Sequence, residues 1–381
     1  MNAATVPASP QSLARGATGT ALLAIEQALT GGETWTAAHQ AISAAFAEEA
    51  DAGPGACLLH GVPALALVLR AAQADGQRRY RAEARVLGEH VARITRQRLA
   101  VSVALEDSGS ARSFRVHDLF FGLVGLGTVL LRIDPGGEAL AGILRHLVQI
   151  TRPRTVGGLE VPGWWAYDDP DTTVQTPGGH ANLGMAHGGA GILALMSLCA
   201  RHEVVVDGQH DAIRSLARWY ASWRKESPGG SWWPQWLTLT DLRDGTPAQS
   251  RGWRPSWCYG ATGIGRALQL AAISIGDGAA QATAEQAIAA CLQPAQLARL
   301  AEPGLCHGLA GLYVTALRAA DDARRPDIAI RLPAAAVLLT GRAEAPGDGG
   351  LLTGSAGVRL ALESVRNGTP RSGWDACLLI T

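Results

Sequence analysis

The stretch YGATGIGRALQLAA, residues 259–272, combines a Gly-x-x-Gly step with a long apolar run. A similar combination occurs seven times along the 381 residues. The first glycines of these steps are Gly16, Gly61, Gly122, Gly188, Gly260, Gly308 and Gly354, separated by 45 to 72 residues. Repeat two departs from the pattern, because Ala64 stands where the other repeats have a second glycine. Self-similarity of this kind is typical of a repeat architecture.

Each repeat has room for two helices. The residues after each glycine step are mostly Leu, Ala, Ile and Val, which predicts a helix buried on most sides. Between these runs lie amphipathic stretches, such as residues 35–50 and 210–226, with apolar residues at helical spacing and charges on the opposite face. Signals for β-strands are nearly absent. The chain is therefore expected to alternate apolar and amphipathic helices.

This alternation limits the architectures that bury the apolar helices. Amphipathic helices can surround apolar ones as an outer ring around an inner ring, which is an α/α toroid. An open helical solenoid is the alternative, but its terminal repeats should carry polar caps. The last residues, WDACLLIT at 374–381, are mostly apolar and favour closure. We predict an all-α toroid of seven helical-hairpin repeats, forming a single domain over residues 1–381.

Composition excludes several classes of function. The 33 basic and 33 acidic residues balance, so the chain has no net positive charge that would favour binding to nucleic acid. No apolar stretch approaches the ~20 residues that span a bilayer, and residues 1–19 lack the pattern of a secretory signal. Six cysteines without an export signal are expected as free thiols or metal ligands rather than disulfides. These features predict a soluble, cytoplasmic protein.

Aligning the repeats on their first glycine reveals a candidate metal site. Cys258 and Cys306 occupy the same position in repeats five and six, and His307 follows Cys306. Neighbouring repeats of a toroid place equivalent positions side by side, so these residues can meet although 48 positions separate the cysteines. Two thiolates and an imidazole are good zinc ligands and leave a fourth position for substrate, as in catalytic zinc sites. The alternative, small buried cysteines and a core histidine, does not explain the matching register.

Four further polar residues fall near this end of the predicted toroid. His187 has the ligand histidine's position in repeat four and is a candidate general acid or base, or else a structural histidine at a helix start. Asp118 could orient an imidazole, and Arg254 could stabilise an oxyanion, although each could equally be an ordinary loop charge. His60 shares the register but has no evident polar partner, so we expect a structural role there.

Tryptophans cluster at residues 164–165, 232–236 and 253–257, which suggests a surface or cavity rim. The first two clusters could line a peptide groove, because aromatic residues anchor such surfaces. Packing at loop–helix junctions is an equal alternative.

Three motifs resemble the lanthionine synthetase C-like family, whose bacterial members are lanthipeptide cyclases. They are WCYG at 257–260, CHG at 306–308 and NLGMAHGG at 182–189. The resemblance covers essentially the whole chain. It implies an α/α toroid with zinc held at the positions of Cys258, Cys306 and His307. The chain has no room for the dehydratase domain of class II enzymes. The intervals between its repeats are too short for the β-rich domain that some members insert, so it resembles a stand-alone class I cyclase.

The resemblance also implies a reaction and partners. Family members add peptide cysteine thiols to dehydroalanine or dehydrobutyrine, which gives lanthionine or methyllanthionine. Family active-site positions fall on His187, Asp118, Arg254 and Tyr259. His187, supported by Asp118, would protonate the enolate that Arg254 or Tyr259 stabilises. The expected partner is a dehydrated precursor peptide, with a dehydratase and a membrane transporter complex as further candidates. Addition of glutathione and a non-catalytic scaffold are the rival functions.

Overall fold

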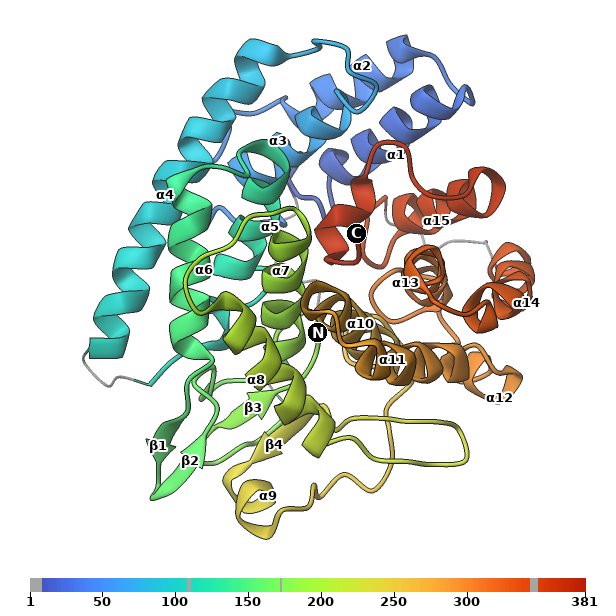
Figure 1. Cartoon of the computed structure of the whole chain (residues 1–381). Coiled ribbons are helices and arrows are strands. Elements are labelled where there is room, and N and C mark those ends of the chain that lie inside the picture. The colour runs from blue at the N-terminus through green and yellow to red at the C-terminus, as the bar shows by residue number, and fades with distance from the viewer. Residues whose placement is uncertain (1–8, 108–110, 172, 343–348) are drawn as a thin grey trace.

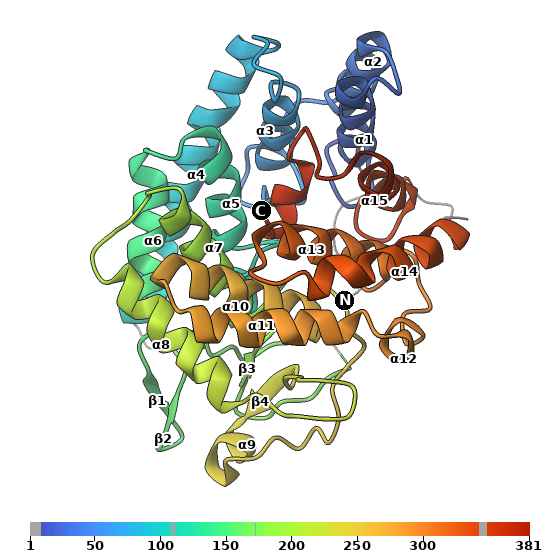
Figure 2. The ribbon, with the colours of Figure 1, turned by 45° about the vertical axis from the view of Figure 1, so that its right-hand side comes forward.

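The computed structural model describes residues 9–107, 111–171, 173–342 and 349–381. Its long helices form an inner ring and an outer ring (Figure 1; Figure 2). The inner helices are α1 (Ala17–Thr30), α3 (Val62–Ala71), α5 (Leu123–Ile133), α7 (Gly189–Arg201), α10 (Ala261–Ile275), α13 (Leu309–Asp322) and α15 (Ser355–Asn367). The outer helices are α2 (Trp35–Ala45), α4 (Arg81–Asp107), α6 (Glu138–Ile150), α8 (Gln209–Ser222), α11 (Gly278–Cys291) and α14 (Asp327–Gly341).

The ring is closed. Each inner helix packs against the next one in the chain, and α15 packs against α1. Backbone hydrogen bonds also join the corresponding loops of neighbouring repeats, such as Leu13 N to Leu59 O at 2.9 Å and Cys306 N to Leu352 O at 2.9 Å. The bond from Leu351 N to Leu13 O, at 3.3 Å, links repeat seven back to repeat one. The predicted α/α toroid is therefore confirmed, and an open solenoid is excluded.

The second glycine of each step allows the inner helix to pack onto its own preceding loop. A Cβ added at Gly263 would lie 1.9 Å from the carbonyl oxygen of Trp257, six residues earlier. The same contact in repeats one, three, four, six and seven would measure 2.7, 2.1, 2.5, 1.8 and 1.8 Å. Repeat two accepts Ala64 because its loop takes another course, with Gly61 at a φ of 74°. The second glycine of the repeat therefore marks a close approach between the inner helix and the backbone of its preceding loop.

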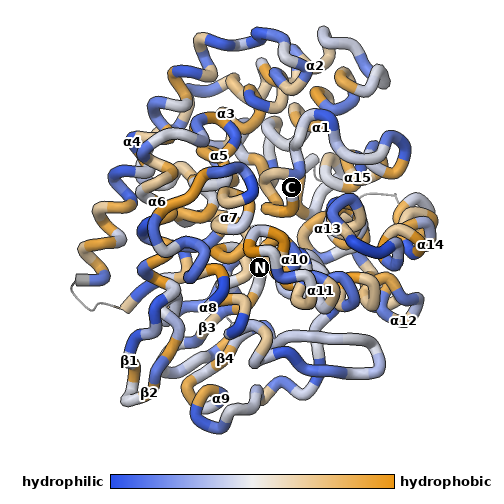
Figure 3. The backbone as a smooth tube through the Cα atoms, in the orientation of Figure 1, coloured by the Kyte–Doolittle hydropathy of each residue, from blue (hydrophilic) through white to orange (hydrophobic). Residues whose placement is uncertain are grey.

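Burial differs between the rings as the sequence pattern predicts. In α7 every residue from Gly189 to Cys199 is buried, whereas α8 buries only the residues along one face. Apolar colouring accordingly concentrates toward the inside of the ring (Figure 3). Among the described helices, none combines the length and apolar character that crossing a membrane requires.

Repeat seven differs from the predicted helical hairpin. In the described part of the chain, α15 has no outer helix after it, and the chain continues into the 3₁₀-helix η3 (Trp374–Leu378). This segment lies inside the ring (Figure 1), where Trp374 is fully buried and η3 contacts α3 and α5. The carbonyl oxygen of Leu378 accepts the indole N–H of Trp257 at 2.9 Å. The apolar C-terminal residues therefore fill the centre and support the loop before α10.

The described residues also form four short strands that were not predicted. Strands β1 (Arg154–Val156) and β2 (Leu159–Val161) form one antiparallel pair, and β3 (His180–Asn182) and β4 (Trp236–Thr238) form another. With the short helix α9 (Leu239–Asp244) they extend below the ring in Figure 1. Gly157 and Gly158 both have positive φ, as a two-residue hairpin turn requires. The sequence gives no signal for these strands, because three-residue strands are too short to show alternation.

The tryptophan clusters are mostly buried rather than exposed. Trp164, Trp165 and Trp233 are 2%, 0% and 3% exposed, and each indole N–H donates to a backbone carbonyl. A rim or groove position was therefore wrong for these three, and packing at loop junctions describes them. Trp253 is 52% exposed, and Trp232 is half-buried. Any peptide-contacting role is confined to such residues.

Replacing Trp164 by alanine should lower the free energy of unfolding by about 3–5 kcal/mol, because it leaves a large cavity in the core. Its ring also packs edge-on against Trp219, with ring centroids 5.1 Å apart. Urea unfolding measures this loss. The matched control, Trp253→Ala, removes an exposed ring and should cost less than about 0.5 kcal/mol. Equal costs for the two variants would contradict the assigned burial.

Candidate metal centre and active site

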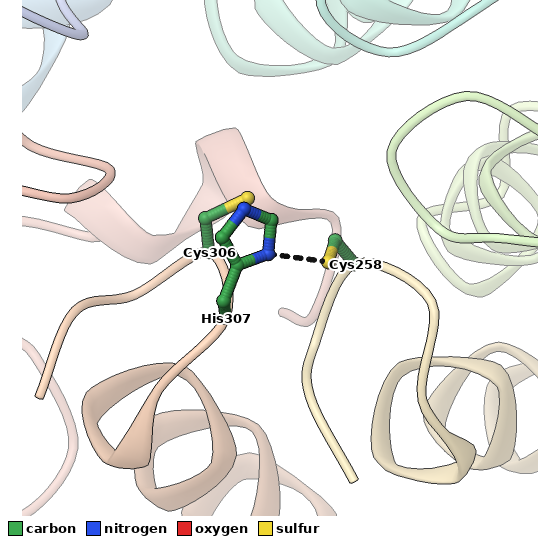
Figure 4. Close-up of side chains that lie close together, drawn as sticks. All are labelled: Cys258, Cys306 and His307. Atoms are coloured by element: carbon green, nitrogen blue, oxygen red, sulfur yellow. Dashed lines mark hydrogen bonds between the residues drawn. The ribbon is translucent and has the colours of Figure 1, made fainter. Parts of the chain in front are cut away.

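The loops before α10 and α13 bring three potential ligands together. These loops run side by side, with Cys258 N donating to Cys306 O at 3.4 Å. The ligand atoms of Cys258, Cys306 and His307 all lie within 4.8 Å of one another (Figure 4). Cys258 Sγ and His307 Nδ1 lie 3.1 Å apart. The structure therefore gathers the residues that the repeat register predicts to meet.

This donor set fits a zinc ion. Two cysteine sulfurs and one imidazole nitrogen are the ligands of catalytic zinc sites with three protein ligands. Cys258 and Cys306 are 1% and 2% exposed, whereas His307 is half-buried. Among the described residues, no other group of three His, Cys, Asp or Glu side chains converges in this way, and no fourth such residue joins this one. A fourth tetrahedral position would thus be available to a substrate.

The pKa values of the two cysteines shift in opposite directions. Burial acts to raise the pKa of Cys258, but hydrogen bonds from Cys306 and His307 outweigh it and hold this pKa well below 9.0. The same hydrogen bond to Cys258, together with burial, raises the pKa of Cys306 well above its ordinary value. Ser256 Oγ lies 3.5 Å from Cys258 Sγ and is a further hydrogen-bonding partner. A thiolate at Cys258 provides a site prepared for a cation.

His187 and Asp118 form a buried pair. His187 Nδ1 lies 2.6 Å from Asp118 Oδ2, and both side chains are 0% exposed. The other carboxylate oxygen of Asp118 accepts the backbone N–H of Phe121 at 2.8 Å, which fixes the carboxylate. Because a carboxylate accepts hydrogen bonds, the His187 proton lies on Nδ1. His187 Nε2 is buried and has no hydrogen-bond partner in the described part of the chain.

Aromatic rings surround His187. The ring centroids of Phe114, Phe120, Phe121 and Tyr259 lie 5.2, 5.1, 6.4 and 6.2 Å from its own. Only Phe121 and Tyr259 are partly exposed. Access to His187 is therefore expected to pass these two rings, and Tyr259 connects the pair to the adjacent ligand, Cys258.

Tyr259 stays a neutral phenol. Burial, with the added charges of Asp169, Cys258 and Cys306, raises its pKa well above 10.0 although the hydrogen bond from Asn182 opposes this shift. Asn182 Nδ2 donates to the Tyr259 hydroxyl at 3.1 Å. Tyr259 can therefore act as an O–H donor.

Arg254 lies at the edge of the ligand cluster. Its positive charge acts to lower the pKa of Cys306, although hydrogen bonding to Cys258 and burial outweigh this effect. Its guanidinium is paired with Glu302, with Nη1 and Oε1 3.1 Å apart, and its side chain is 27% exposed. Sequence analysis missed Glu302, Ser256 and Asn182. Glu302 and Ser256 could have been found because they lie close in sequence to the ligand cysteines. Asn182 could have been found because it is the first residue of NLGMAHGG.

His60 occupies the same register in repeat two but has a different environment. Its Nε2 lies 3.1 Å from Asp51 Oδ2, and its Nδ1 lies 3.4 Å from Ser9 Oγ. The expectation that it lacks a polar partner was wrong, because Asp51 comes from a non-repeating loop. With both ring nitrogens engaged, His60 has the contacts of a structural histidine.

Two other buried histidines, His117 and His146, should make the fold acid-sensitive. Burial, assisted by the positive charge of Arg112, lowers their pKa values from 6.5 to about 3 and about 4. The unfolded chain therefore binds more protons below about pH 6.5, and stability falls as pH falls toward 4. The expected slope is about 1.4 kcal/mol per pH unit for each histidine.

Unfolding curves between pH 7 and 4 test this effect. His146→Gln can keep the hydrogen bond that Ser102 makes to the histidine at 2.8 Å, and it should flatten the slope. His210→Gln, on the outer helix α8, should leave the slope unchanged. Identical slopes for all three proteins would refute the assignment.

Comparisons with known proteins identify the fold and the family. Among solved structures, nisin cyclase is similar, with a TM-score of 0.84 and 17% sequence identity over 99% of this chain and 93% of that chain. At this identity the likeness establishes the fold. No curated protein sequence matches the chain. The profile of the lanthionine synthetase C-like protein family matches residues 7–379, and the chain therefore belongs to the lanthionine synthetase C-like family.

Proposed function

We propose that this protein is a zinc-dependent lanthipeptide cyclase. It would add peptide cysteine thiols to dehydroalanine or dehydrobutyrine and form lanthionine or methyllanthionine rings. The observation that carries the proposal is the Cys258–Cys306–His307 cluster next to the His187–Asp118 pair, within a family toroid. Nisin cyclase, by its name, acts in ring formation and shares this fold.

Cys258, Cys306 and His307 would hold the zinc. Bound there, the ion supplies a Lewis acid that lowers the pKa of an incoming peptide thiol. Two cysteine ligands keep the net charge of the site low, which preserves the nucleophilicity of that sulfur. His307 is half-buried while the cysteines are buried, so a peptide is expected to approach on the histidine side.

The reaction requires one proton to change place. The peptide thiol loses its proton, and its sulfur forms a bond to the β-carbon of the dehydroamino acid. The π-electron pair of the C=C bond moves toward the α-carbon and its carbonyl oxygen, giving an enolate. The α-carbon then takes up a proton. Its proposed donor is His187 Nε2, which has no partner among the described residues while Asp118 holds Nδ1. In this proposal Nε2 first accepts the proton that the peptide thiol releases and then gives it to the α-carbon.

Two groups are candidates for stabilising the enolate oxygen. Tyr259 offers a neutral O–H, because its raised pKa keeps it protonated. Arg254 offers a cation but is engaged with Glu302. A donor placed where charge develops is worth about two to three orders of magnitude in rate. We assign this role to Tyr259 and assign Arg254 to the rim of the site.

Mass spectrometry of a dehydrated Cys-containing peptide tests the proposal. Cyclisation leaves the mass unchanged but removes thiols that N-ethylmaleimide can alkylate. Adding glutathione separates the rival activity, which increases the peptide mass by one glutathione for each addition. Peptide binding without either change would instead indicate a scaffold that holds a precursor peptide for a dehydratase or transporter complex. A cyclase should lose alkylatable thiols with zinc present and without glutathione.

A further inference from the structure

Asn182 fixes the direction of a hydrogen bond at the candidate active site. Its side-chain Oδ1 accepts the backbone N–H of Gly184 at 2.9 Å. A backbone N–H can only donate, so this contact identifies the oxygen of the amide. The Nδ2 group therefore faces Tyr259 and donates to its hydroxyl oxygen at 3.1 Å.

This arrangement leaves the hydrogen of the Tyr259 hydroxyl unused. Because the oxygen accepts from Asn182, its own hydrogen must point elsewhere. Within the described residues, the hydroxyl has no acceptor for that hydrogen. Tyr259 follows the ligand Cys258 and its ring lies 6.2 Å from that of His187. The ring that carries this hydroxyl therefore lies beside the imidazole assigned to the reaction.

The Asn182 side chain is held in place from several sides. It is 2% exposed and lies at the end of β3, where it pairs with Trp236 of β4. Its backbone carbonyl oxygen accepts the indole N–H of Trp164 at 3.2 Å. Gly188 packs so closely that an added Cβ would lie 2.2 Å from this backbone oxygen and 2.6 Å from the side-chain Oδ1. The amide is therefore pre-organised rather than recruited by a substrate.

We propose that Asn182 is a positioning residue that makes Tyr259 a hydrogen-bond donor to the carbonyl oxygen of the dehydroamino acid. The inference rests on the proposed cyclase function. Negative charge grows on that oxygen when sulfur attacks the β-carbon, so a pre-directed O–H stabilises the transition state more than the ground state. Without Asn182, the hydroxyl can rotate and accept a hydrogen bond instead.

Asn182→Asp tests this role with little change in shape. One carboxylate oxygen can still accept the Gly184 N–H, but the other accepts from Tyr259 and turns its hydrogen away from the substrate. We expect kcat to fall by about 10²-fold with zinc content unchanged. In the Tyr259→Phe background the same substitution should have almost no further effect on kcat. Equal losses in both backgrounds would show a merely structural role and overturn the inference.

A spectroscopic measurement separates this inference from the proposed function. The chain has five tyrosines, so the ¹³Cζ resonance of Tyr259 can be assigned in labelled, zinc-loaded protein by its loss in Tyr259→Phe. Asn182→Asp should shift this resonance, and an unmoved resonance overturns the hydrogen bond. The resonance could shift in Asn182→Asp while the wild-type protein forms no thioether. That result would contradict the proposed function and leave the hydrogen bond in place. If Asn182→Asp does not fold, Asn182→Ser can keep the Gly184 contact and should show the same non-additivity with Tyr259→Phe.

Discussion

Replacing Cys306 by alanine should reduce bound zinc from about one equivalent to nearly none and abolish ring formation. The variant keeps Cys258 and His307, but two ligands cannot hold the ion firmly. It also removes the partner that holds the pKa of Cys258 low, since Cys306 donates to that thiolate. Elemental analysis of the purified protein measures the zinc, and alkylation of a dehydrated peptide measures the activity.

The matched control for this variant is Cys291→Ala. Cys291 is also buried and free, but it lies in α11 and is not part of the converging cluster. This control should keep its zinc and its turnover, and lose only the stability expected for a small cavity. Full zinc and activity in Cys306→Ala would remove the site assignment.

Replacing His187 by asparagine should slow cyclisation by about two to four orders of magnitude, the usual size of an acid–base contribution. Asparagine can still donate to Asp118, so the buried carboxylate keeps a partner. The substitution removes Nε2, the atom that has no partner among the described residues and is assigned to protonate the α-carbon. Zinc content should stay near one equivalent, because the metal ligands come from other loops.

His60→Asn provides the comparison within the same chain. His60 has the same repeat position and also contacts a carboxylate, Asp51, but both of its ring nitrogens have partners. We expect this variant to retain turnover near that of the wild type. An unchanged rate in His187→Asn, measured with saturating peptide, would remove His187 from the mechanism.

The repeat register predicts the ring and the meeting of the ligands because both depend on backbone equivalence. Once Gly260 and Gly308 begin adjacent inner helices, Cys258 and Cys306 must lie on neighbouring loops, and a hydrogen bond between these residues joins the loops. The second glycine of each step also predicts close packing, since a missing Cβ allows the helix to approach the carbonyl oxygen of its own loop. These features follow from spacing alone.

Other features depend on loops that do not repeat, and periodicity says nothing about their course. Asn182 contacts Tyr259 across 77 positions, through a strand too short to predict. Asp51 reaches His60 from such a loop as well. Burial of Trp164 and Trp165 was also unpredictable, because their neighbours come from distant segments. Site residues that occupy repeat positions are therefore predictable. The residues that contact them from non-repeating loops are not.

Zinc K-edge X-ray absorption of the zinc-loaded protein tests the central claim most directly. The account predicts two sulfur ligands at about 2.3 Å and two nitrogen or oxygen ligands at about 2.0 Å, one of them from His307. Adding a dehydrated peptide that contains a cysteine should raise the sulfur count from about two to about three. Three results would contradict the account: no bound zinc, four sulfur ligands in the absence of peptide, or a sulfur count that does not change when the peptide is added.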